Sequence, residues 1–206
     1  MPTEAMIGCV VLGAGFGRRF GADKRTQSLG AQTVAEATLQ RYCQAFASVR
    51  LVIREADDAK LITGAHHQRS NLQILRAPLA HLGMGHSLSA GFMDLEWRWG
   101  FVALLDMPYV QSTTLQGLIA HAQASRSKLI QPRLHNTQSA HLERLQGHPI
   151  GIHQDLFAHV RASTGDQGAR RLLQQYAAEI DYFDCEDAGV IQDIDRPADL
   201  RDPGPT

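Results

Sequence analysis

Short apolar runs alternate along the chain with segments in which apolar residues recur every three or four positions. From the runs we expect strands at 6–12, 49–54, 72–77, 100–105 and 127–132. From the amphipathic segments we expect helices near 33–47, 57–65, 85–97 and 112–124. This alternation is typical of a three-layer α/β/α fold with a mostly parallel sheet.

The pattern changes after residue 131. Residues 133–147 are polar, rich in histidine and weakly periodic, so we interpret them as a loop or flap with little core. Beyond them we expect strands at 149–152, 178–187 and 189–195, helices at 154–163 and 166–177, and a last short helix with Pro197 in its first turn. The tail at 202–206 is expected to fray, and we expect one domain over residues 1–206.

Composition narrows the class of protein. A chain of 206 residues can bury a core without disulfides, and its formal net charge of −1 provides no general basic field for nucleic acid. The apolar run at 6–12 is too short to span a membrane. We expect the three cysteines, Cys9, Cys43 and Cys185, to be reduced thiols, with Cys9 in the core. The ten histidines lack the spacing of zinc ligands. We therefore expect a soluble cytoplasmic protein with no nucleic-acid or membrane partner.

Unusual residues follow three of the predicted strands. A loop rich in glycine and arginine occupies 13–24, "PLAHLGMGHS" occupies 78–87, and "DMP" occupies 106–108. In open α/β sheets, ligands bind beyond the carboxyl ends of the strands. These three segments are therefore predicted to line one site.

The glycine loop, "GAGFGRRFGADK", fits neither of two common phosphate-binding signatures. No Lys-Ser or Lys-Thr pair follows Gly21, as a P-loop requires. The dinucleotide pattern G-x-G-x-x-G ends on Arg18 when counted from Gly13 and on Phe20 when counted from Gly15, which disfavours NAD and FAD. Two interpretations remain: a longer loop that wraps a phosphate chain, or a strand-to-helix turn with a solvated basic face.

The loop resembles the first signature of the molybdenum cofactor cytidylyl- and guanylyltransferases, the MobA-like NTP transferases of the glycosyltransferase-A-like nucleotidyltransferase superfamily. That signature runs L-A-[AG]-G-x-[SG]-x-R-[MF]-G-x-x-K. Five further segments resemble family motifs in the same order: "GMGHSLSAG" at 83–91, "LLDMPYV" at 104–110, "GHPIGI" at 147–152, "GDQGARRLL" at 165–173 and "DIDRPADL" at 193–200. Each motif alone is weak, but the ordered set is specific.

The resemblance implies a Mg²⁺-dependent enzyme that transfers CMP from CTP to a phosphate acceptor, molybdopterin above all, beside a molybdoenzyme or chaperone partner. The cytidylyl branch is closest, although Gly13 stands where that branch has alanine and keeps GTP open. A sugar- or alcohol-phosphate nucleotidyltransferase and a non-catalytic nucleotide-binding regulator also remain. The divergent segment 133–147 replaces a compact G-x-x-G of the family and leaves the acceptor open.

The resemblance also implies roles for individual residues. Arg18 and Lys24 would neutralise the phosphates and, with Asp106, form the catalytic set; Ser87 would read the base with the backbone of 77–79. The full nucleotide-binding set is Leu12, Gly13, Ala14, Gly15, Gly17, Arg18, Lys24, Ala77, Pro78, Gly83 and Ser87. The acceptor-binding set is His148, Asp166 and Arg170.

The metal site is predicted from carboxylates at strand ends. Asp106 follows an apolar strand directly, and its oxygens suit Mg²⁺, although an aspartate there can also cap a turn or helix. A second ligand is expected from the "DID" segment, where strand alternation would put Asp193 and Asp195 on one face. Asp195 is preferred, and the alternative is that both only cap the last helix.

Overall fold

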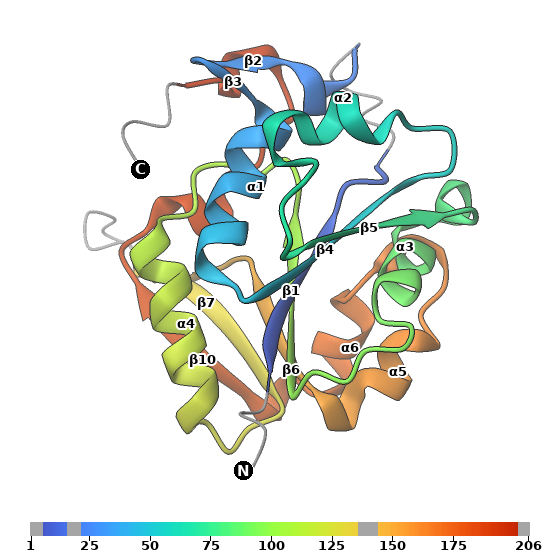
Figure 1. The fold of residues 1–206 in the computed structure, drawn as a ribbon. Coiled ribbons are helices and arrows are strands. Elements are labelled where there is room, and N and C mark those ends of the chain that lie inside the picture. The colour runs from blue at the N-terminus through green and yellow to red at the C-terminus, as the bar shows by residue number, and fades with distance from the viewer. Residues whose placement is uncertain (1–5, 16–21, 136–143, 202–206) are drawn as a thin grey trace.

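The computed structural model describes residues 6–15, 22–135 and 144–201, in which a mixed sheet separates two layers of helices (Figure 1). The strands that form the sheet, in spatial order, are β10 (Ile180–Cys185), β7 (Leu129–His135), β9 (Ile150–His153), β6 (Trp99–Leu104), β1 (Ile7–Leu12), β4 (Ser48–Arg54) and β5 (Leu72–Ala77). Only β9, and β8 (Arg144–Gln146) at the side of β7, run antiparallel to their neighbours. The predicted mostly parallel α/β fold is confirmed.

Alternation along β1 explains why both faces of the sheet are covered. Cys9 and Val11 pack toward α1 (Val34–Ala45) and α4 (Ser112–Ala124), with α2 (Ala59–Thr63) beside α1. Val10 and Leu12 pack toward the opposite layer of α3 (Met84–Gly91), α5 (Phe157–Arg161) and α6 (Arg170–Gln175) (Figure 1). Since successive strand residues face opposite sides, a run without polar residues is what a central strand needs. Cys9 is fully buried, as predicted.

Several predicted helices are shorter than their apolar patterns suggested, and α3 and α6 show why. Helix α3 ends at Gly91, and Leu95 and Trp97 are buried from the loop that follows, which contains Asp94 with φ 53°. The helix predicted at 166–177 becomes a 3-10 turn (Gly165–Gln167) followed by α6, because Gly168 has φ 51°, which no helix residue adopts. None of the helices in the described ranges is long and apolar enough to cross a membrane.

Part of the predicted flap at 133–147 is a strand pair. Strand β7 continues to His135, and β8 pairs with it through Leu134 and Leu145; residues 136–143 lie outside the described ranges. On the other side of β7, Arg133 donates to both carboxylate oxygens of Asp184 on β10 at 2.6 and 2.9 Å. Strand β8 is short, and its Leu145 is 42% exposed, so it forms without an apolar pattern that the sequence could reveal.

The predicted strand at 189–195 was wrong. Residues Ala188–Ile191 form a 3-10 turn, because the Asp187 carboxylate accepts hydrogen bonds from the backbone N–H of Gly189 at 2.9 Å and of Gln111 at 2.8 Å. The predicted last helix is a 3-10 turn with Pro197 at its first position. The predicted frayed tail at 202–206 lies outside the described residues.

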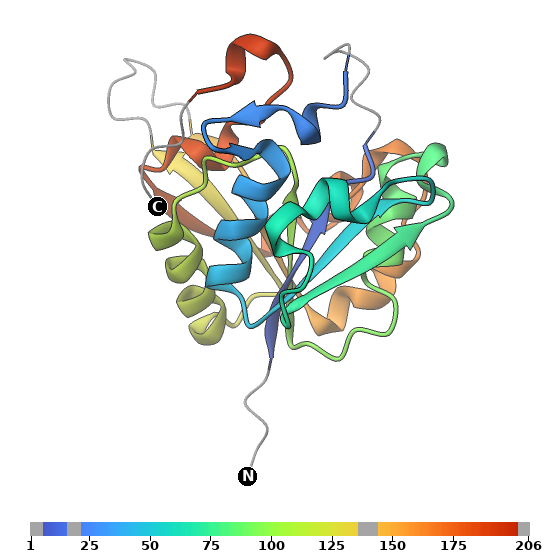
Figure 2. The same cartoon turned by 45° about the horizontal axis from the view of Figure 1, so that its top comes forward.

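We refer to residues 187–201 as the C-terminal strap. It crosses the carboxyl end of β6 and lies beside the ribbon of β2 (Ser28–Leu29) and β3 (Gln32–Thr33) (Figure 2). The N–H of Ile194 donates to the Asp106 carbonyl at 2.9 Å, and the Tyr109 hydroxyl donates to the Asp199 carbonyl at 2.8 Å. Fully buried Ile194 packs with Leu29 and its neighbours. The strap is therefore fastened to the turn that follows β6.

Substitution of Gly189 by alanine should loosen this strap. A Cβ at Gly189 would lie 2.2 Å from the Tyr109 carbonyl oxygen and 2.7 Å from the Val110 nitrogen, both backbone atoms that cannot turn aside. Such overpacking should lower the free energy of unfolding by about 1–3 kcal/mol in urea titrations. Gly15→Ala is the control, because its Cβ would meet no atom within 4 Å. Equal stability of Gly189→Ala and wild type would contradict the packing.

Candidate functional site

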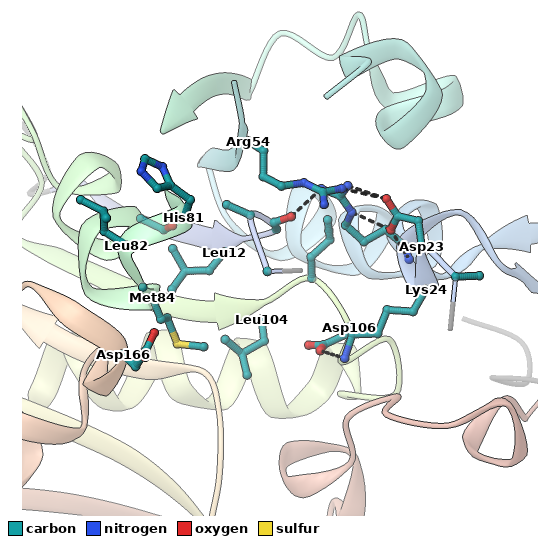
Figure 3. A pocket seen from close by; sticks show the side chains of 18 residues that line it. Leu12, Asp23, Lys24, Arg54, His81, Leu82, Met84, Leu104, Asp106 and Asp166 are labelled. Carbon is teal, nitrogen blue, oxygen red and sulfur yellow. Dashed lines mark hydrogen bonds and ion pairs between the residues drawn. The ribbon is translucent and has the colours of Figure 1, made fainter. Parts of the chain in front are cut away.

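A pocket of about 750 Å³ opens at the carboxyl ends of β1 and β6, between the two ends of the glycine loop and the start of α3 (Figure 3). Its lining residues are Leu12, Gly13, Ala14, Gly15, Ala22, Asp23, Lys24, Arg25, Arg54, His81, Leu82, Gly83, Met84, Ser87, Leu104, Leu105, Asp106 and Asp166. All three segments singled out in the sequence contribute to it.

The first end of the glycine loop is held tightly against the sheet. The N–H of Gly13 donates to the Val52 carbonyl at 2.8 Å, and a Cβ at Gly13 would lie 2.5 Å from Cδ2 of Leu105. A side chain at this position would therefore have to displace Leu105, which follows β6. Leu12, Gly13, Ala14 and Gly15 line the pocket as predicted, whereas Gly17 and Arg18 lie outside the described residues.

The second end of the loop is fixed by a buried arginine that sequence reasoning missed. Arg25 is 4% exposed and donates to Gly13 O at 2.7 Å, to both carboxylate oxygens of Asp57 at 2.6 and 2.8 Å, and to those of Asp23 at 2.8 and 2.5 Å. Arg54 donates to Asp57 and Asp23, each at 2.9 Å. These two arginines and two aspartates, the arginine clamp, join both stems of the loop to the end of β4.

Three carboxylates meet beside the pocket, and one of them, Asp106, lines it. Asp106, Asp193 and Asp195 each offer an oxygen, and these atoms lie within 4.8 Å of one another. Burial raises the pKa of the Asp193 carboxyl, and the charges of Asp106 and Asp195 raise it further. Although the predicted strand is absent, the extended chain still presents both strap aspartates on the side opposite buried Ile194. We refer to these three residues as the acidic cluster.

Lys24 reaches into the acidic cluster instead of lying free in the pocket (Figure 3). Its Nζ is 2.6 Å from Asp106 Oδ2 and 3.1 Å from Asp195 Oδ1. Burial alone would lower the pKa of Lys24, but the two carboxylates outweigh it and raise that pKa. The predicted contact of Lys24 with phosphates thus requires its ammonium to leave these oxygens.

The predicted acceptor residues lie apart, and within the described chain Asp166 is the one of the three that lines the pocket. Burial lowers the pKa of His148 to about 4 against the opposing charge of Asp106, so this imidazole is neutral at pH 7 near the acidic cluster. Asp166 lies beside Gly83, on the 3-10 turn that packs against the start of α3 (Figure 3). Arg170 is exposed and is not among the lining residues of the described chain. The structure therefore does not gather the three into one site.

The residues that face the α3 end of the pocket differ partly from those predicted. Ser87 and Gly83 line it, but the described lining does not include Ala77 or Pro78; Ala77, the last residue of β5, is only 2% exposed because its side chain packs in the core. His81, Leu82 and Met84 take their place. The sequence signal that could have found them is the pair of large apolar residues on either side of Gly83 in a predicted loop, Leu82 and Met84. In the structure these side chains are 50% and 46% exposed.

Comparison with known proteins gives a consistent result. Residues 9–180 match the model of the MobA-like NTP transferase domain. The purine catabolism protein PucB of Bacillus subtilis (strain 168) is 30% identical over 209 residues, covering 96% of this chain and 95% of PucB.

Solved structures show the same fold. Rv0371c of Mycobacterium tuberculosis H37Rv, in complex with manganese, superposes with a TM-score of 0.76 at 22% identity over 98% of both chains. The molybdopterin-guanine dinucleotide biosynthesis protein A of Archaeoglobus fulgidus superposes with a TM-score of 0.64 at 18% identity over 95% of both chains. The fold is the Rossmann-like fold of nucleotidyltransferases.

Arg25→Met should destabilise the protein strongly, because it leaves the buried Asp57 carboxylate with one charged partner fewer. Loss of one member of a buried pair typically lowers the free energy of unfolding by about 3–5 kcal/mol. Urea titration against Arg133→Met gives the comparison, since the pair of Arg133 with half-exposed Asp184 should contribute only about 0–1 kcal/mol. Similar losses for the two variants would show that the arginine clamp does not anchor the loop.

Proposed function

The chain belongs to the MobA-like NTP transferase family and is a nucleotidyltransferase, and from this premise we propose that it transfers CMP from CTP to a phosphate-bearing acceptor, with molybdopterin the favoured acceptor. The observation that supports this most is that the glycine loop, Lys24 and Asp106 line one pocket, and that Asp106 also belongs to a cluster of three carboxylates. A triphosphate chain needs backbone N–H donors, a cation and a metal site side by side.

The acidic cluster fits a divalent cation. Hard carboxylate oxygens within 4.8 Å of one another suit Mg²⁺ or Mn²⁺, and the related Rv0371c was solved in complex with manganese. We propose that Asp106 and Asp195 hold the ion, with Asp193 beside them. When bound, such an ion would offset phosphate charge and help to align the reacting groups.

The residues of the chain would then act by binding and orientation. In the proposed reaction, an oxygen of the acceptor phosphate attacks the α-phosphorus of the nucleotide, and the bond to pyrophosphate breaks. The backbone at 12–15 would hold the phosphates, and Lys24 would neutralise charge that accumulates on the leaving pyrophosphate. His148, held neutral near Asp106, is the residue of the predicted acceptor set that lies nearest the acidic cluster, and we propose that it accepts a hydrogen bond from the acceptor.

CTP is preferred over GTP because the motifs "GMGHSL" and "GDQGAR" resemble the cytidylyl branch. Gly13, the residue that keeps GTP open, lies close to the Leu105 side chain, so its small size serves packing whichever base is bound. Ser87, His81 and Met84 are the side chains proposed to face the base and ribose.

The choice of nucleotide is tested by thermal unfolding with each nucleoside triphosphate and Mg²⁺. We expect CTP to stabilise the protein more than GTP, ATP or UTP, because a ligand at a hundred times its Kd adds about 2.7 kcal/mol to stability. A larger shift with GTP would assign the protein to the guanylyl branch. Equal shifts with all four would mean that the proposed base contacts are absent.

Asp106→Asn should remove activity and leave the fold intact. The substitution keeps the size of the side chain but removes the charge that would anchor the metal, so pyrophosphate release should fall by at least about a hundredfold. The free energy of unfolding should change little, because Lys24 keeps Asp195 as a partner. Asp155→Asn, at a half-exposed surface carboxylate, is the matched control. Normal turnover of Asp106→Asn at saturating CTP would refute the metal assignment.

A further inference from the structure

The ammonium of Lys24 lies where a cation would bind the acidic cluster. It contacts one oxygen of Asp106 at 2.6 Å and one of Asp195 at 3.1 Å, and its side chain is only 15% exposed. One oxygen from each of the three carboxylates lies within 4.8 Å of the others, so a second cation bound by Asp106 and Asp195 would lie close to Nζ. Two positive charges this close in a partly buried site repel one another.

The backbone of Lys24 is held by its neighbours, whereas its side chain is held only at the ammonium, by the ion pairs with Asp106 and Asp195. Residue 24 begins the short turn Lys24–Thr26, and both of its neighbours, Asp23 and Arg25, belong to the arginine clamp. A lysine carries its charge on a flexible four-carbon stem with three rotatable donors, unlike the planar fork of arginine. The Lys24 ammonium can therefore leave the carboxylates for the pocket, which Lys24 also lines, without any movement of the loop stem.

We propose that Lys24 is the internal counter-ion of the acidic cluster, and that it and a divalent cation compete for Asp106 and Asp195 until a bound triphosphate draws Lys24 away. This inference rests on the proposed function. Without nucleotide, Lys24 neutralises the carboxylates and keeps the affinity for free metal low. The phosphates offer Lys24 another partner, so nucleotide and metal each promote the binding of the other, by the same factor.

The competition is tested with Mn²⁺ alone, by following the electron paramagnetic resonance signal of free Mn²⁺ during titration of the protein. Lys24→Met removes the ammonium and keeps the length of the side chain, and it should bind Mn²⁺ roughly tenfold more tightly than wild type, a change of about 1.4 kcal/mol. Lys24→Arg should bind close to wild type. Lys60→Met, at an exposed lysine of α2, is the control.

Two results would overturn the proposal. One is Mn²⁺ affinity of Lys24→Met equal to or below that of wild type, with circular dichroism showing both folded. The other is a gain in affinity that persists in Lys24→Met/Asp106→Asn, because the extra ion would then bind elsewhere.

A second titration separates this proposal from the proposed function. Binding of a non-hydrolysable CTP analogue is measured by equilibrium dialysis with EDTA, so that no divalent ion is present. Lys24→Met should bind the analogue several-fold more weakly than wild type, the opposite of its effect on Mn²⁺, because the released ammonium would contact the phosphates. Equal binding would contradict the movement of Lys24. If wild type binds no nucleotide at all, with or without Mn²⁺, the proposed function fails, while the Mn²⁺ titration still judges the competition.

Discussion

The attachment of the C-terminal strap to the turn after β6 is the contact on which the site depends. Asp106 follows β6 directly, whereas Asp193 and Asp195 arrive from the other end of the chain. The carbonyl of Asp106 accepts the N–H of Ile194, so the backbone atoms on either side of the cluster are joined by a hydrogen bond of 2.9 Å. This bond between the two segments that carry the aspartates brings three like charges together, which their mutual repulsion would otherwise prevent.

Two groups of charges with different chemistry surround the glycine loop. The arginine clamp balances two arginines against two aspartates, and its planar guanidinium groups bind carboxylates through paired hydrogen bonds that fix the backbone. Burial raises the pKa of the Asp57 carboxyl there, although Arg25 opposes the rise. At the acidic cluster, one flexible lysine faces three carboxylates. The first group holds the loop in place, and the second can exchange one cation for another.

The sequence predicts most of the fold because its signals are local. Short apolar runs located β1, β4, β5, β6 and β7, and the helical period located α1 and α4. Pro197 marked the last turn for a similar reason, since its fixed φ suits a first helical position. The errors fall where a distant contact decides the backbone, as when Asp187 binds the N–H of Gln111 and turns an apolar run into a 3-10 turn. Strand β8 was not predicted, because its three residues, "RLQ", form no apolar run.

The site could be predicted only in outline. Motif order placed Asp106, Lys24 and the strap aspartates at one sheet edge, but spacing could not show that Lys24 contacts the carboxylates or that Arg25 is buried. Both facts depend on partners far away in the chain, Asp195 and Asp57. The side chain of Ala77 packs in the core, so the predicted contact of residues 77–79 with the base rests on their backbone and stays a prediction.

The most direct test is a crystal structure with Mn²⁺ and a non-hydrolysable CTP analogue, measured at the manganese absorption edge. The account predicts an anomalous peak bound by oxygens of Asp106 and Asp195, with the triphosphate along residues 12–15 and the Lys24 ammonium on its phosphates. An anomalous peak elsewhere, with Lys24 still bridging Asp106 and Asp195 beside a bound triphosphate, would contradict it.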